Sequence, residues 1–181
     1  MDMVQDSDLV IFNRCAEGTK AASYKRNIKA VNQKAEIIFE DSNGEIDEIF
    51  EDDLPYNLED DPIVLDNTGY GIWYIDSMDH LERYLDKKIQ FTAQVLKPEN
   101  FPKDAFVPGR MAMTCCAEDM SFLGYVCKYG ETDKLEQRDW VKVTAVVREE
   151  YWKDYNGKGP VLHALKVEKT KKPREEIISF M

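Results

Sequence analysis

Alternation of apolar and polar residues over residues 87–169 most strongly limits the folds open to this chain. Four apolar residues alternate in the segment KKIQFTAQVLK: Ile89, Phe91, Ala93 and Val95. The segment DWVKVTAVVREEYW repeats the pattern with Val141, Val143, Ala145 and Val147. This period of two is typical of strands with one buried face. Three further segments, GRMAMTCCA, FLGYVCKY and GPVLHALKVEK, are also strand-like, so the chain carries five consecutive strands without a helical crossover.

Five such strands with glycine-rich or aspartate-rich breaks predict a small closed barrel of the OB type over residues 63–181. The segments PIVLD and GYGIWYID, just upstream, are predicted as strands. SMDHLERYLD is predicted as a short preceding helix with Ser77 as its N-cap. In the last strand, His163 is placed on one face with Val161, Leu165 and Val167.

The first forty residues predict a β-α-β fragment. DLVIFNR and KAEIIFE are short apolar strands, and GTKAASYKRNIKAVN between them has helical spacing. The phosphate-binding patterns GxxxxGK[ST] and GxGxxG are absent from the chain. The chain as given is therefore not expected to hydrolyse GTP. The fold class predicted overall is α+β: a remnant of an α/β nucleotide-binding domain (1–40), an acidic linker (41–62) and the barrel.

Charge excludes some functions. Residues 40–62 hold eleven acidic residues and no Lys or Arg, and they account for the formal net charge of −11. With 24 basic against 35 acidic residues, nucleic acid is not an expected partner. No apolar run is long enough to cross a bilayer and no export signal is evident, so we expect no membrane insertion and a cytoplasmic location.

Three cysteines, Cys115, Cys116 and Cys127, are the main candidates for chemistry. Four cysteines in the whole chain are too few for a disulfide scaffold. Three interpretations stay open: small apolar residues of the core, ligands of a metal ion, or redox thiols. A metal site would need a bulge or turn at the cysteine pair, and either a fourth ligand from Asp119, His163 or His80 or an open position.

Other polar residues have plainer interpretations. A lone histidine on an apolar face, such as His163, is more often a packed core residue than a ligand. Arg110 is interpreted as half of a surface ion pair with Glu118 or Asp119, or as a positive charge that lowers the pKa of a thiol. No Ser-His-Asp grouping is evident, so hydrolytic catalysis has no support.

The N-terminal part has a family resemblance. QDSDLVIFNRC followed by YKRNIKAVNQKAEIIFE, roughly residues 5–40, resembles the late part of the P-loop domain of CobW-type GTPases. Asn13 and Arg14 fall on the Asn and Lys of that family's guanine-specificity motif. Ala16 stands where the specificity Asp belongs, and Gln33 replaces a Pro. The resemblance implies metal homeostasis controlled by GTP, with Asn13 and Arg14 as nucleotide-binding residues.

The C-terminal part, about residues 78–168, resembles the C-terminal domain of the YcgQ family, small bacterial proteins associated with a membrane permease. The matching positions are Phe106, Arg110, Thr114, Cys115, Cys116, Asp119, Gly124, Trp140, Val141, Val143, Tyr155, Gly157, Pro160 and Leu162. Ala145 departs from the glycine expected there.

Together these features predict the C-terminal portion of a CobW-like, GTP-binding metal-homeostasis protein. Its barrel would bind a soft divalent ion such as zinc through Cys115, Cys116 and Cys127, with Asp119 or His163 as further ligands. GTP would act only in a longer protein, and the expected partners are a P-loop domain or a metal-receiving protein. The alternative is a non-enzymatic OB-like module that binds a protein and uses its cysteines for packing.

Overall fold

The structure is a computed structural model that describes residues 4, 6–16, 21–32, 34–45, 54–113 and 120–179. Its helices and strands are β1 (Leu9–Phe12), α2 (Ala21–Val31), β2 (Glu36–Asp41), β3 (Gly44–Glu45), β4 (Ile63–Val64), α3 (Asn67–Asp79), β5 (Lys88–Leu96), β6 (Ala105–Met113), β7 (Met120–Gly124), β8 (Val126–Lys128), β9 (Trp140–Trp152), β10 (Gly157–Lys169) and β11 (Ile177–Ser179). Three short 3₁₀ turns are η1 (Leu81–Arg83), η2 (Thr132–Lys134) and η3 (Lys153–Tyr155).

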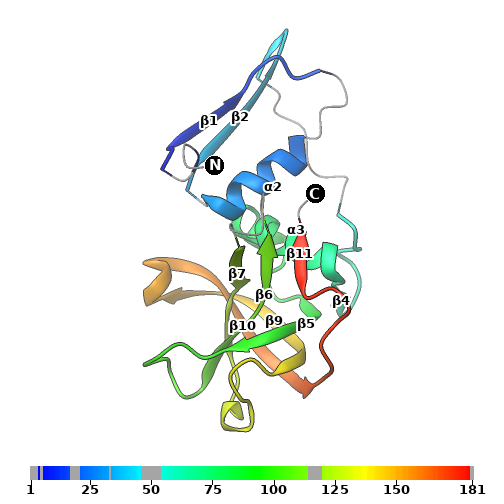
Figure 1. The fold of residues 1–181 in the computed structure, drawn as a ribbon, viewed down its shortest axis with the longest axis vertical. Coiled ribbons are helices and arrows are strands. Elements are labelled where there is room, and N and C mark those ends of the chain that lie inside the picture. Colours follow the sequence, from blue (N-terminus) through cyan, green and yellow to red (C-terminus); the bar gives the residue numbers. More distant parts are fainter. Residues whose placement is uncertain are drawn as a thin grey trace.

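The N-terminal residues form a small sheet with one helix. Strands β1 and β2 pair in parallel, and α2 lies between them in the sequence. This is the β-α-β arrangement that was predicted. Phe12 and Phe39 stack between the strands with ring centroids 4.8 Å apart, and Tyr24 of α2 contacts Phe12 at 5.3 Å. The small sheet, α2 and α3 follow one another toward the barrel (Figure 1).

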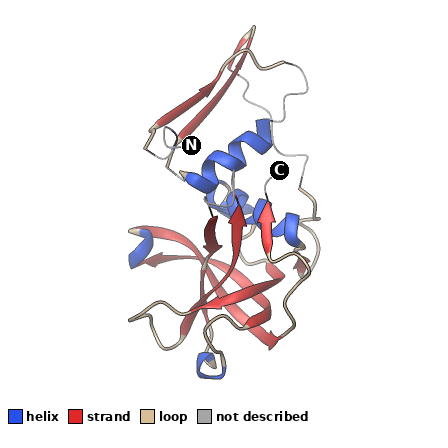
Figure 2. Ribbon diagram, in the orientation of Figure 1, coloured by secondary structure: helices blue, strands red, loops and turns tan. Residues whose placement is uncertain are grey.

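The barrel is closed by five strands in the order β5–β6–β8–β10–β9 and back to β5. β8 and β10 run parallel, and the other neighbouring pairs of the ring are antiparallel. β7 also pairs with β6 and is separated from β8 by Tyr125. The predicted α+β class with an OB-like barrel is confirmed (Figure 2).

Helix α3 contradicts part of the prediction. The segment GYGIWYID is helical, and the helix begins after Asp66, whose carboxylate accepts a 2.7 Å hydrogen bond from the Gly69 N–H. Ser77 lies near the end of this helix and is not an N-cap. The helix was missed because residues on most of its sides are buried. A short apolar run of this kind has no helical period and cannot be told from a buried strand by its pattern.

Aromatic side chains join α3 to the barrel core. Trp73 packs with ring centroids 5.5 Å from Phe91 and 5.4 Å from Tyr125. The Tyr125 hydroxyl donates to the backbone carbonyl of Tyr74 at 2.5 Å and accepts a hydrogen bond from Ser77 at 3.0 Å. The inward residues of β5 and β9 complete this core, as their alternation predicts. In the part of the chain that is described, no helix is long and apolar enough to cross a bilayer.

The last barrel strand also departs from the prediction. A shift in register between Ala164 and Lys166 takes Leu165 out of the ladder, and its side chain is 57% exposed. Val161 packs in a small outer cluster, whereas Val167 packs against the main core. The single face predicted for Val161, His163, Leu165 and Val167 is therefore wrong, because a bulge reverses the alternation.

The acidic segment is partly tied to the barrel. Residues 46–53 of the predicted linker lie outside the described residues. Beyond them, Tyr56 and Tyr84 share a hydrogen bond of 2.8 Å between their hydroxyls, and Lys87 donates to the Leu58 carbonyl at 2.8 Å. The boundary predicted at residues 62–63 stays a prediction.

Candidate functional site

The cysteine pair lies between two paired strands. β6 and β7 form an antiparallel ladder in which Met113 is directly opposite Met120. Thr114–Asp119 connects these two residues in the sequence and lies outside the described residues, so Cys115, Cys116 and Asp119 as ligands stay a prediction. The structure describes the two residues at the base of this connection, Met113 and Met120, at the end of the β6–β7 ladder.

Soft side chains flank this base. Met111 and Met113 are two residues apart on β6, so they share the face opposite to Arg110 and Ala112, which are both buried. Met120 is the cross-strand neighbour of Met113 and is exposed. Directly opposite side chains on an antiparallel pair have Cβ atoms about 4.5–5.5 Å apart. Three thioethers therefore lie on one face at this end of the β6–β7 ladder. They stand in the sequence as the pattern MxM…M but were not among the predicted ligands.

Cys127 has a different environment. It faces the barrel core from β8, is 0% exposed, and is paired in register with Phe106 and Leu162. Burial raises the pKa of its thiol far above the ordinary value. Metal ions bind the thiolate form, so a ligand role at this position would require ionisation inside the apolar core.

His163 lies on the outer face of β10 with two charged neighbours. Its Nε2 is 2.5 Å from a carboxylate oxygen of Glu150, and the other oxygen of Glu150 accepts a short hydrogen bond from Lys128. That bond from Lys128 is the main reason that the pKa of Glu150 is lowered. Lys128 is in register with both His163 and Ala105, at the opposite end of β6 from Met113. Eight residues of strand span about 26 Å. His163 is therefore close to the Ala105 end of β6, whereas the segment with the cysteine pair follows the Met113 end in the sequence.

Arg110 is not a surface residue. Its side chain is 2% exposed, and its five hydrogen bonds match the five N–H donors of a guanidinium. The acceptors are the Asn67 side-chain oxygen and the backbone carbonyls of Thr92, Glu175 and Glu176. The guanidinium also lies 5.3 Å from the ring centroid of Trp140. The predicted surface ion pair is thus wrong, because these partners come from segments distant in the sequence.

The comparisons with known proteins bear on the same region. A family model described as the DUF1980 C-terminal domain matches residues 40–178. The chain belongs to this family. The matched region includes the whole barrel, the cysteine pair, Arg110 and the described part of β11 up to Ile178. No curated protein was found to match the chain.

Two solved structures show distant similarity to the chain. A putative aspartyl-tRNA synthetase from Leishmania major Friedlin is 14% identical with a TM-score of 0.33, over 55% of this chain and 21% of that one. The mitochondrial single-stranded DNA-binding protein Rim1 from S. cerevisiae is 9% identical with a TM-score of 0.30, over 47% of this chain and 96% of that one. This DUF1980 C-terminal domain chain thus spans about a fifth of the first structure's length.

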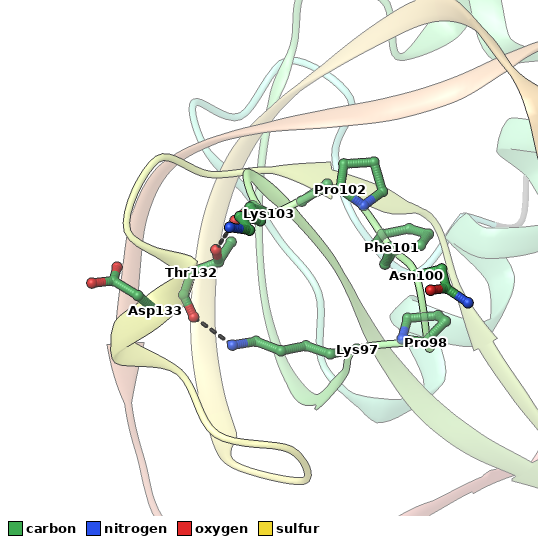
Figure 3. A pocket seen from close by; sticks show the side chains of 9 residues that line it. Lys97, Pro98, Asn100, Phe101, Pro102, Lys103, Thr132 and Asp133 are labelled. Carbon is green, nitrogen blue, oxygen red and sulfur yellow. Dashed lines mark hydrogen bonds between the residues drawn. The ribbon is translucent and has the colours of Figure 1, made fainter.

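A pocket of about 350 Å³ lies between the β5–β6 connection and η2 in this DUF1980 domain (Figure 3). Lys97 reaches across it and donates to the backbone carbonyls of Thr132 at 2.5 Å and Leu135 at 2.6 Å. The Thr132 hydroxyl donates to the Lys103 carbonyl. These polar groups hold two connections of the barrel together, which is a structural role.

The predicted nucleotide-binding residues lie outside the matched family region. Asn13 and Arg14 are exposed and follow the carboxyl end of β1, and Arg14 has a left-handed backbone with φ of 57°. This is the end of a parallel strand at which open α/β sheets bind ligands. Within the part of the chain that the structure describes, no three His, Cys, Asp or Glu side chains gather as a metal site.

Proposed function

We propose that the end of the β6–β7 ladder binds a soft metal ion through Cys115 and Cys116. The observation that carries this proposal is the register that sets Met113 opposite Met120 at the base of the cysteine segment. Thiolate and thioether ligands select zinc, copper(I) and similar soft ions over magnesium or calcium. Two residues of chain span at most about 7 Å, so Cys115 is within reach of the Met113 thioether.

The ligand set follows from position along the strands. Cys115 and Cys116 supply thiolates, and Asp119, which directly precedes Met120, supplies a carboxylate. Zinc with this set would take a nitrogen, sulfur or oxygen ligand in the fourth position, whereas copper(I) would use the thioethers. Cys127 is left out of the proposed set because it is enclosed in the core. His163 is left out because it lies on β10, near the end of β6 that is far from Met113.

We further propose that this binding serves metal homeostasis together with a P-loop domain of the CobW type. The support is the small parallel sheet, since parallel sheets are normally covered on both faces. Here α2 covers one face, whereas Leu9 and Ile11 are exposed on the other. A P-loop domain packed on this face would bind GTP near Asn13 and Arg14, and release of the metal to a receiving protein would follow the nucleotide state.

Metal content after loading tests the proposed site. The chain is purified under reducing conditions, exposed to zinc or to copper(I) without oxygen, desalted and analysed for metal. We expect about one ion per chain, and we expect C116S to lose it. C15S is the matched control, because Cys15 lies in the small N-terminal sheet unit. Equal metal in the wild type and C116S, or no metal in either, would refute the site.

The second candidate is a non-enzymatic OB-like module that binds a protein and has structural cysteines. The observation in its favour is the complete burial of Cys127 in the barrel core. If the chain binds no zinc or copper(I) after loading, this second function is the better explanation.

A further inference from the structure

Backbone contacts hold the C-terminal tail, residues 175–179, to the barrel. Arg110 Nη2 donates to the Glu175 carbonyl at 2.5 Å and to the Glu176 carbonyl at 3.3 Å, and its Nε donates to the latter at 3.4 Å. Asn67 Nδ2 donates to the Glu175 carbonyl at 3.3 Å. β11 then pairs in parallel with Met111–Met113. Contacts of this kind do not depend on the identity of the side chains.

Two side chains add specificity. Ile178 is 1% exposed and packs in the main core opposite Ala112, whereas its neighbour Ile177 is 43% exposed. The Glu175 carboxylate accepts a 2.9 Å hydrogen bond from Asn67 Nδ2. The groove formed by Arg110, Asn67 and the edge of β6 thus accommodates an acidic residue and, three positions later, a buried aliphatic residue.

The tail does not fill the groove. An open pocket of about 360 Å³ remains between the tail and the start of α3, lined by Asn67, Arg110 and Thr92 on one side and by Pro173 and Glu175 on the other. The preceding residues Lys171, Lys172 and Arg174 are exposed. In the described part of the chain, β11 has three residues.

We propose that the groove formed by Arg110, Asn67 and the edge of β6 is a peptide-binding site of the strand-addition type, occupied here by the chain's own tail. Its other occupant is an extended segment of a partner protein with an acidic residue three positions before an aliphatic one. Main-chain hydrogen bonds supply affinity and the pocket for the aliphatic side chain supplies selectivity, as in other strand-addition sites. This proposal does not depend on metal binding.

The test uses the full chain and a fluorescent peptide of the tail sequence PREEIIS. The tail competes for the groove, and the apparent affinity of a ligand falls with the fraction of the protein that is free to bind it. Ile178→Asp should release the tail and tighten peptide binding by about tenfold or more. The matched control Ile177→Asp changes an exposed side chain on the same strand and should bind the peptide as the wild type does.

The peptide itself supplies the second comparison. A peptide with Asp in place of the residue that corresponds to Ile178 should not bind, whereas Asp at the position of Ile177 should be tolerated. Folded Ile178→Asp protein that binds the peptide no more tightly than the wild type would overturn the proposal. Equal binding of the two altered peptides would also overturn it.

A measurement on the wild type covers the case in which Ile178→Asp does not fold. Excess peptide should raise deuterium uptake in residues 175–179, because the displaced tail loses its hydrogen bonds, while uptake in β9 and β10 stays constant. Unchanged uptake in the tail at peptide concentrations that saturate any binding would overturn the proposal.

Discussion

The buried guanidinium of Arg110 donates a 2.5 Å hydrogen bond to the backbone carbonyl of Glu175, 65 residues further along the chain. Each of its five hydrogen bonds ends on a neutral oxygen. The positive charge is therefore stabilised by carbonyl dipoles and the Trp140 ring, and it joins β6, α3 and the C-terminal tail in one network.

Replacing Arg110 should destabilise the fold. Arg110→Ala removes hydrogen bonds from a buried charged donor, and we expect the free energy of unfolding to fall by about 2–4 kcal/mol. Arg110→Lys should rescue little, since an ammonium has three donors and lacks the planar fork. Urea unfolding measures both, with exposed Arg174→Ala as the control. A change for Arg110→Ala no larger than for Arg174→Ala would contradict this role.

Cys127 should behave as a buried neutral thiol. Its pKa is raised by burial, so the folded state holds the proton while the unfolded chain loses it at an ordinary pKa of about 8.5. The stability linked to this group is therefore intact below that pH and is lost as the pH rises above it, by up to about 1.4 kcal/mol per pH unit. Urea unfolding of the wild type and Cys127→Ala from pH 7 to 10 measures the difference between their slopes. Identical pH slopes would show that this thiol ionises freely.

His163 should be dispensable for metal binding. It is the register partner of Lys128, which in turn pairs with Ala105 at the end of β6 that lies away from Met113. His163→Ala should leave the metal content unchanged and should cost at most about 1 kcal/mol of stability, because its contact with Glu150 is partly exposed. Metal analysis alongside Cys116→Ser checks this. Loss of metal from His163→Ala would contradict a site at the Met113 end of β6.

Much of the fold was predictable from pattern. The alternation from Ile89 to Val95 and from Val141 to Val147 identifies β5 and β9, because one face of each strand is buried in the core. The β-α-β order was also predictable. Helix α3 was not, since Ile75 and Gly71 are buried as well as Tyr70, Trp73 and Tyr74, on other sides of the helix, and leave no amphipathic signal. The capping residue Asp66 was the available clue.

The site was only partly predictable. The adjacent cysteines are visible in the sequence, but the pairing of Met113 with Met120 requires the strand register. The partners of Arg110 on Glu175 and Glu176 depend on the return of the tail to β6, which no local pattern encodes. The bulge at Leu165 was invisible for a similar reason, because it depends on the neighbouring strand β9.

Thermal melting with and without a soft metal tests the central claim most directly. Ligand at a hundredfold excess over its Kd stabilises a protein by about 2.7 kcal/mol, which corresponds to a rise in Tm of about 5 °C or more for a chain of this size. We predict this rise for the wild type with zinc or copper(I) under reducing conditions, and its absence in the double variant Cys115→Ser, Cys116→Ser. Equal shifts in both proteins, or no shift in the wild type, would contradict metal binding at the β6–β7 ladder.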